Sequence, residues 1–143
     1  MIKPLITDKS LLTAESAWVN SPYVSLEVGN DLRDTAATLK DCGGLAAPQI
    51  GHLHRVILVH VQGKAMIMVN PVILERKGKR AWGEERCFSV LSSFKWPKRV
   101  KRFFKIKVKF NAETGDITTM TFKGHESRLI QHEIDHLDGK LIG

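Results

Sequence analysis

The stretch QHEIDHLDG, at positions 131–139, is the feature that most constrains how this chain folds. It contains the pattern H-E-x-x-H, in which His132 and His136 lie four residues apart. On a helix, two such residues share one face about one turn apart, so both can bind a single metal ion. Glu133, beside the first histidine, can act as a general base on a metal-bound water. The pattern predicts a closing helix over roughly 126–137 that carries a metal site; the alternative is a pair of histidines packed in an amphipathic face.

A catalytic metal site of this type needs a third protein ligand. Only LDGKLIG follows the second histidine, and Asp138 is the candidate there, so we expect the third ligand upstream. Cys87, within EERCFSV, is the stronger candidate because thiolates bind zinc and iron well. Cys42 remains open as a second candidate, and either cysteine can be an ordinary buried thiol.

Length and composition fit one globular domain that spans residues 1–143. The chain is 43% hydrophobic and 26% charged, which is ordinary for a soluble domain of this size. No apolar run approaches the roughly 20 residues that cross a membrane, and the start MIKPLITDKSLL lacks the pattern of a secretory signal. Two cysteines in such a chain favour free or metal-binding thiols over a disulfide. We therefore expect a cytoplasmic protein without membrane partners.

The net charge of +7 is concentrated in KWPKRVKRFFKIKVK, residues 95–109. One interpretation is a surface that meets a polyanion such as a ribosome. The plainer interpretation is the solvated face of a half-buried strand, because lysines alternate with Ile106, Val108 and Phe110. Charge alone does not identify a partner, so we favour the plainer interpretation.

Periodicity along the chain predicts an α+β fold. Val28, Leu32, Ala36 and Leu39 fall on one face of an expected helix that ends before the glycines at 43 and 44. Alternating or continuous apolar runs predict several short strands, with Asn70-Pro71 as an interruption; the expected strands are 55–61, 64–70, 72–77, 99–111 and 117–122. Short turns between them indicate mostly antiparallel pairing, packed around the C-terminal metal-binding helix.

The loop GGLAAPQIG, residues 43–51, follows the first expected helix. Its glycines permit close approach of a ligand to the backbone, and Gln49 carries an amide that can donate to a developing oxyanion. Taken alone, this stretch is no more than a tight loop after a helix.

Taken together, three stretches resemble the motifs of the peptide deformylases, in the same order. The family patterns are G-Φ-G-Φ-A-A-x-Q (Φ apolar), E-G-C-Φ-S and Q-H-E-x-D-H-L-x-G. Here they read CGGLAAPQ (42–49), ERCFS (85–89) and QHEIDHLDG (131–139). The third match is complete. The resemblance implies a metal-dependent hydrolase that removes the formyl group from the N-terminal formyl-methionine of nascent polypeptides and releases formate.

The resemblance also implies the roles of individual residues. One divalent metal ion, usually Fe(II) in the family, with Zn(II), Ni(II) or Co(II) as substitutes, would be bound by Cys87, His132 and His136. Catalysis would use Glu133 as general base, with the Gln49 side chain and the backbone N–H of Phe88 at the oxyanion. The substrate would lie extended between residues 43–45 and 86–88; the residues implied in binding it are Gly43, Gly44, Leu45, Arg86, His125 and Leu129. Gln131, Asp135 and Glu85 would support the site, the last through a basic residue.

Several positions depart from the family pattern. Cys42 and Gly43 replace a glycine and an apolar residue of the first motif, and Arg86 replaces the glycine of the second. The sequence ends at Gly143, as in the truncated forms of the family that include phage proteins, so we expect a phage-like form. Contact with the ribosome would then use the basic strand, through Lys101, Arg102 and Lys105, without sequence-specific binding of nucleic acid.

Two other functions remain open from the sequence. A small zinc peptidase would also use H-E-x-x-H, but it predicts a downstream third ligand and gives GGLAAPQ no role. A metal-stabilised basic module that binds RNA or the ribosome without catalysis fits the charge and the departures. It does not explain why Gln49 and Glu133 occur together with the three ligands.

Overall fold

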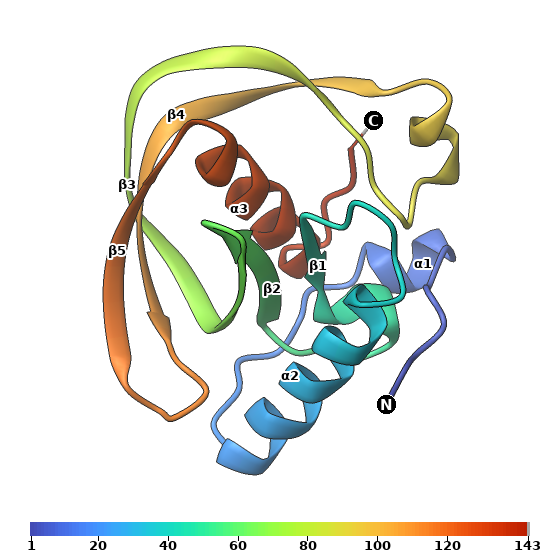
Figure 1. The fold of residues 1–143 in the computed structure, drawn as a ribbon, viewed down its shortest axis with the longest axis vertical. Helices are drawn as coiled ribbons and strands as arrows, with labels where there is room; N and C mark the ends of the chain where they lie inside the picture. Colours follow the sequence, from blue (N-terminus) through green and yellow to red (C-terminus); the bar gives the residue numbers. More distant parts are fainter. Residues whose placement is uncertain (143) are drawn as a thin grey trace.

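A computed structural model describes residues 1–142 and shows five strands, three α-helices and two short 3-10 helices (Figure 1). The helices are α1 (Lys9–Leu12), α2 (Pro22–Ala36), η1 (Ala47–Ile50), η2 (Leu91–Phe94) and α3 (Gly124–Leu137). The strands are β1 (Gly44–Ala46), β2 (Val56–Val61), β3 (Lys64–Glu85), β4 (Lys98–Asn111) and β5 (Ile117–Lys123). Within the described part of the chain, no helix is long and apolar enough to cross a membrane.

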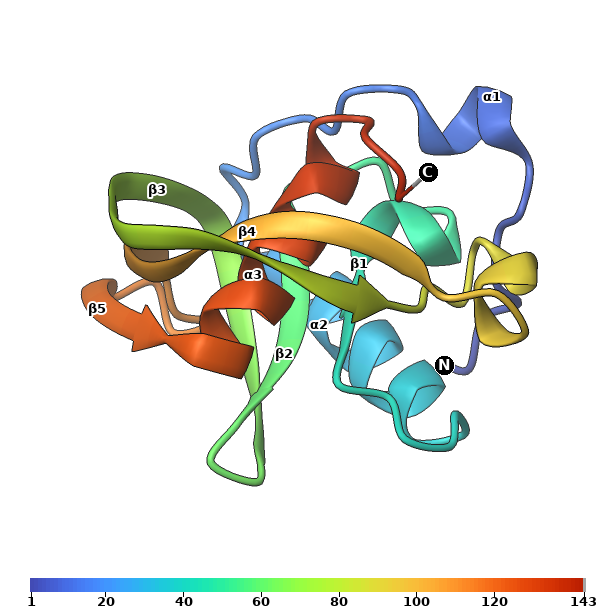
Figure 2. The same cartoon turned by 90° about the horizontal axis from the view of Figure 1, so that it is seen from above.

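The strands form one antiparallel sheet in the order β1-β2-β3-β4-β5. Strands β3, β4 and β5 curve around α3, which lies on the concave side of the sheet (Figures 1 and 2). The α+β class, the antiparallel pairing and the central C-terminal helix confirm the sequence prediction.

The sheet has a core on each side where β2 crosses it. Val28, Leu32 and Ala36 of α2 pack with one face of β1 and β2, while Ile130, Ile134 and Leu137 of α3 pack with the other face and with β4. Strand β2 is buried on both faces, so its sequence VILVHV is a continuous apolar run instead of an alternating one.

Strand β3 corrects the prediction of short strands. Asn70-Pro71 does not end the strand, which continues to Glu85 with a register shift between Val69 and Val72. Asn70 adopts φ of 51°, and its side chain bonds both backbone groups of Val19. The Asn-Pro pair therefore makes a bulge in a 22-residue strand.

The first helix and the glycine loop also differ from expectation. Helix α2 begins at Pro22, whose fixed φ suits a first helical turn, and it ends at Ala36 instead of near residue 40. The loop after it contains strand β1, which pairs with β2 from Gly44 to Ala46. A strand of 3 residues is too short for a periodicity argument to detect.

The C-terminal end of α3 is fixed by contacts with the N-terminal region. Arg55 donates to the carbonyl of Leu137 at 3.1 Å and to the carboxylate of Asp138 at 2.6 Å. Gly139 follows with φ of 74°, and a Cβ there would lie 2.3 Å from the carbonyl oxygen of Thr13. These contacts fix the C-terminal end of α3 against Arg55 and Thr13.

Candidate functional site

Three ligand-type side chains converge under the end of β3. Donor atoms of Cys87, His132 and His136 lie within 4.8 Å of one another, and all three residues are buried. The sulfur of Cys87 is 3.2 Å from Nε2 of His136. Helix α3 supplies the two histidines from successive turns, as the sequence spacing predicts. Cys42 lies apart and is hydrogen-bonded to the carbonyl of Gly44.

Glu85 orients the first histidine. Nδ1 of His132 donates to Oε1 of Glu85 at 2.9 Å, which leaves Nε2 free to face the cluster. Burial alone would lower the pKa of His132, but Glu133, Cys87 and Glu85 raise it to about 10. The pKa of His136 is lowered to about 3 by burial and by His132. Without an ion, the cluster therefore holds a proton on His132 beside a neutral His136, and a bound cation would take the place of that proton.

Two arginines hold Glu85 in place. Arg102 donates to both its carboxylate oxygens at 2.9 and 3.0 Å, and Arg128 donates at 2.8 Å. Burial would raise the pKa of Glu85, but His132 and Arg102 outweigh it and lower it to about 2. Arg102 also pairs with Asp135. These are the basic partners that the sequence left unnamed.

The position of Arg102 corrects one expectation from the sequence. Its side chain is 8% exposed and bound to carboxylates on both sides, so it is not part of a basic surface. Its parity along β4 matches that of Ile106 and Val108, but Phe104 between them is exposed, so alternation alone could not have placed Arg102.

Glu133 is a buried carboxylate poised beside the cluster. Burial raises its pKa to about 7. Its Oε1 has no hydrogen-bond partner within residues 1–142, which is unusual for a buried polar atom. Gly44 makes room for it, because a Cβ at that position would lie 2.7 Å from Oε2 of Glu133. A carboxyl group near neutral pKa with a free oxygen is suited to accept and return a proton.

Gln49 is held with its amide nitrogen toward the same cluster. Its Oε1 accepts from the N–H of Ala46 at 2.9 Å, which fixes the orientation of the amide. Its Nε2 donates to Ser89 at 3.1 Å and faces the sulfur of Cys87 at 3.6 Å. The 3-10 turn η1 therefore presents an N–H donor at the cluster, as an oxyanion site requires.

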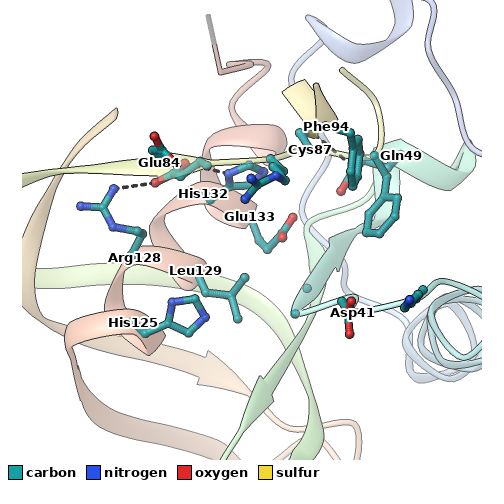
Figure 3. Close-up of a pocket in the computed structure, with 16 residues that line it drawn as sticks. Asp41, Gln49, Glu84, Cys87, Phe94, His125, Arg128, Leu129, His132 and Glu133 are labelled. Carbon is teal, nitrogen blue, oxygen red and sulfur yellow. Dashed lines mark hydrogen bonds and ion pairs between the residues drawn. The ribbon is translucent and has the colours of Figure 1, made fainter. Parts of the chain in front are cut away.

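These groups face a cavity of about 670 Å³ between α3 on one side and residues 40–44 on the other (Figure 3). Figure 3 shows Leu129 and His125 along the α3 wall, with Asp41 opposite them. The residues that line the cavity are Lys40, Asp41, Gly43, Gly44, Gln49, Glu84, Glu85, Arg86, Cys87, Phe88, Phe94, His125, Arg128, Leu129, His132 and Glu133.

Most of the predicted substrate-binding residues reach this cavity. Gly43, Gly44, Arg86, His125 and Leu129 line it, as does Phe88. Leu45 does not, because its side chain is fully buried in the core beside α2; its place in the edge strand β1 leaves only its backbone for a substrate.

Sequence reasoning missed the other lining residues, which are Lys40, Asp41, Glu84, Phe94 and Arg128. Phe94 belongs to η2, and its ring stacks against Phe88 with centroids 5.0 Å apart. Arg128 occupies the α3 face one turn before His132 and bonds the carbonyls of Ala81 and Val100. Its helical spacing from His132 was the available signal.

Gln131, which the sequence analysis expects to support the site, bonds the backbone of β4. Its amide accepts from the N–H of Phe103 at 3.1 Å and donates to the carbonyl of Phe103 at 2.9 Å. It thereby ties α3 to the edge of β4 directly beside the metal-binding face.

Comparisons with known proteins point to one family. Residues 5–143 match the family model described as polypeptide deformylase. The chain is 35% identical to the peptide deformylase of Clostridium beijerinckii over 143 residues, which covers 99% of this chain and 100% of that protein. It is 39% identical to the peptide deformylase of Dictyoglomus thermophilum over 114 residues, covering 77% and 71% of the two chains.

Solved structures agree with these sequence matches. The class I type b peptide deformylase of Acinetobacter baumannii, with Met-Ala-Ser bound, has a TM-score of 0.89 and 29% identity, with 99% of this chain and 97% of that chain covered. A peptide deformylase from Legionella pneumophila has a TM-score of 0.90 and 29% identity, with 99% and 84% covered.

Proposed function

This chain belongs to the polypeptide deformylase family, and from that premise we propose how its residues remove the formyl group from N-terminal formyl-methionine. The observation that carries the proposal is the cluster of Cys87, His132 and His136. Cys87 and His132 of this cluster line one cavity together with Glu133 and Gln49. The reaction is hydrolysis of the formyl amide, which yields formate and a free N-terminal amine.

Cys87, His132 and His136 would hold one divalent metal ion. A thiolate with two imidazoles suits Fe(II), Co(II), Ni(II) and Zn(II), and we propose Fe(II) as the resident ion. Two features support this assignment: Glu85 directs Nε2 of His132 toward the cluster, and the low pKa of His136 leaves its imidazole neutral. A bound ion would displace the proton that His132 carries without it. When bound, the ion supplies a Lewis acid that polarises the formyl carbonyl and lowers the pKa of the attacking water.

Glu133 carries the proton through the reaction. Its unpaired oxygen accepts a proton from the attacking water, and the same carboxyl group returns that proton to the nitrogen of the departing methionine. A pKa near 7 in the buried site makes both transfers feasible near neutral pH.

Gln49 and the backbone N–H of Phe88 stabilise the negative charge that develops on the formyl oxygen. Ala46 and Ser89 fix the Gln49 amide before substrate arrives, so this donor costs little reorganisation during the reaction. Phe88 lines the cavity next to Cys87 and contributes a main-chain donor.

The substrate lies extended between edge strand β1 and the end of β3. Backbone groups of residues 43–45 and 86–88 would pair with it as an added strand. The methionine side chain packs against Leu129 and Gly44, with His125 at the rim. The related A. baumannii enzyme was crystallised with Met-Ala-Ser, a peptide of the kind that this arrangement accepts.

The test is substrate selectivity. Enzyme loaded anaerobically with Fe(II), Ni(II) or Zn(II) would be given formyl-Met-Ala-Ser, acetyl-Met-Ala-Ser and an unblocked peptide with internal amide bonds. We expect formate release from the first peptide only. Cleavage of internal bonds would indicate a peptidase, and no turnover by a folded, metal-loaded protein would indicate a non-catalytic module.

We also propose that the enzyme works in the cytoplasm, bacterial or host, on chains that emerge from ribosomes. The nascent chain carries its formyl group there, and the basic strand β4 supports contact with a polyanion. Co-sedimentation with ribosomes that falls as salt rises would support this contact, and none at low salt would contradict it. Origin from a phage remains a prediction from the sequence.

A further inference from the structure

The convex face of β3, β4 and β5 has no part in the deformylation site. Helix α3 packs inside the curve, and α2 packs against β1, β2 and the start of β3 (Figure 1). Along β4, Ile106, Val108 and Phe110 point inward and are buried. The residues between them therefore point to the convex side, and they are mostly lysines.

Three of the lysines on this face are direct cross-strand neighbours. Lys105 of β4 pairs in register with Lys77 of β3 on one side and with Lys123 of β5 on the other. Like charges directly opposite each other in a sheet are destabilising. Glu75 lies 3.3 Å from Lys77 and offsets part of the repulsion, but Lys107 adds another cation opposite Glu75. An anion bound across this row would remove the repulsion.

An exposed indole lies further along the same pair of strands, beyond a register shift between Lys77 and Arg80. Trp82 pairs in register with Lys101 and is 58% exposed. The charged groups of Arg99 and Lys101 lie 5.5 and 5.9 Å from the centre of its ring. A large aromatic ring held open to solvent between two cations can stack on a base while the cations meet the adjoining phosphates.

Together these residues form a basic stripe, which we define as Lys77, Trp82, Arg99, Lys101, Lys105, Lys107, Lys109 and Lys123. From Arg99 to Lys109 it follows one strand for about 33 Å. A linear array of cations that ends in an aromatic ring matches an extended polyanion with planar bases. It fits a lipid surface less well, because a membrane-binding face presents several apolar side chains for insertion.

We propose that the basic stripe binds single-stranded RNA, with its lysines on the phosphates and Trp82 stacked on one base. The site uses no metal ligand and no residue of the cavity, so it is independent of the deformylation mechanism. It would allow the enzyme to hold an RNA surface while the cavity on the opposite side of β3 receives a peptide.

The test is binding of a fluorescein-labelled 12-nucleotide oligouridylate, followed by fluorescence anisotropy over a range of salt concentrations. Six phosphate contacts, one for each lysine of the stripe, predict a slope of about −4.2 in a plot of log affinity against log salt. The triple variant Lys77→Gln/Lys105→Gln/Lys123→Gln should flatten that slope by about 2. Trp82→Ala should weaken binding by about tenfold and leave the slope unchanged.

The matched control removes three exposed lysines elsewhere, Lys9, Lys64 and Lys140, also by change to glutamine. It should bind the oligonucleotide like the parent apart from a small general effect of charge. Equal weakening by both triple variants, or no effect of the stripe variant, would overturn the proposal. Tighter binding to phosphatidylserine vesicles than to RNA would instead assign the face to a membrane. Formate release from formyl-Met-Ala-Ser should stay unchanged in every variant, which separates this test from that of the proposed reaction.

Discussion

The position of the Glu133 carboxylate depends on the absence of a side chain at Gly44, which faces it. Gly44 of β1 leaves the space that its carboxylate occupies, and burial in that space raises its pKa to about 7. Gly43, one residue earlier, is less confined: a Cβ there would meet only Leu129, at 3.4 Å. Gly44 therefore leaves room for the Glu133 carboxylate, whereas Gly43 does not limit the position of that group.

Gly44→Ala should displace the Glu133 carboxylate, because the new Cβ would lie 2.7 Å from Oε2 and 3.0 Å from Cγ. A shift of about 1 Å in a catalytic group costs about a hundredfold in rate. We expect such a fall in kcat/KM for formyl-Met-Ala-Ser, with metal content unchanged. Gly43→Ala is the matched control and should lose far less. Equal activity of the two variants would contradict this role of Gly44.

Glu85→Gln should weaken metal binding. The amide cannot match the charge-assisted bonds to His132, Arg102 and Arg128, so the imidazole loses its fixed orientation. Loss of such an outer partner costs about 10- to 100-fold in metal affinity. Competition with a chelator, followed by metal analysis, measures the change. The neighbouring variant Glu84→Gln should retain the parent affinity; a similar loss there would refute the assignment.

Individual site residues were predictable to different degrees. His132, Glu133 and His136 follow from spacing on a helix, whereas spacing left Cys87 and Cys42 as alternatives. Family resemblance chose Cys87, and the structure brings it to the histidines. The pairing of Arg102 and Arg128 with Glu85 was missed because Glu85 lies far from both in the sequence, and local pattern carries no information about such distant pairs.

At the scale of elements, specific contacts fix the end of α3 and the side of α2. Helix α3 ends at Leu137, and Gly139 just after it passes close to the carbonyl of Thr13. Helix α2 is tied to the loop after η1 by Asp31, whose carboxylate accepts from Nε2 of His52 at 2.8 Å. The first contact joins the N-terminal segment to the helix that carries His132 and His136, and the second joins α2 to the loop before β2.

Gly139→Ala should destabilise the fold more than Gly115→Ala. Both glycines have positive φ, 74° and 95°, so each substitution costs about 1–2 kcal/mol of backbone strain. Only at Gly139 would the added Cβ also meet a backbone atom, 2.3 Å away. Denaturant unfolding would compare the two, and equal losses would show that the approach to Thr13 does not constrain α3.

Asp31→Asn should lower stability at neutral pH and have little effect in acid. Burial would raise the pKa of Asp31, but His52 and the amino group of Met1 outweigh it and lower the pKa below 3.8. The ionised carboxylate thus stabilises the fold above pH 3.8, and this contribution disappears as pH falls through the lower folded pKa. Thermal unfolding from pH 7 to 3 would measure it, with Glu27→Gln on the exposed face of α2 as control. A difference that does not shrink in acid would contradict this account.

Element boundaries show where periodicity fails. Strands β2, β4 and β5 and helix α3 were found within a few residues because their patterns are long and regular. The sequence predicted two strands in place of β3, because Asn70-Pro71 resembles a strand end. A bulge differs from a strand end only in that the residues after it still pair with a distant strand, here β4. Strand β1 was taken for a loop because its 3 residues form a strand only through pairing with β2.

At the scale of the whole molecule, the sheet separates two surfaces with different chemistry. The concave side holds α3, the buried ligand cluster and the cavity, while the convex side of β3, β4 and β5 carries the basic stripe (Figure 1). The α+β class and the antiparallel order were predictable from turns and alternation. The curvature that wraps three strands around α3 was not, because it arises from bulges and from contacts between distant segments.

We propose that Glu133 performs proton transfer at a metal held by Cys87, His132 and His136. The most direct measurement is formate release from formyl-Met-Ala-Ser by Ni(II)-loaded Glu133→Gln enzyme, with the bound metal counted in the same sample. We predict about one ion per chain and a loss of 10²- to 10⁴-fold in kcat. Full turnover with metal in place would contradict the assignment of Glu133, and loss of the metal would show that the residue serves binding instead of proton transfer.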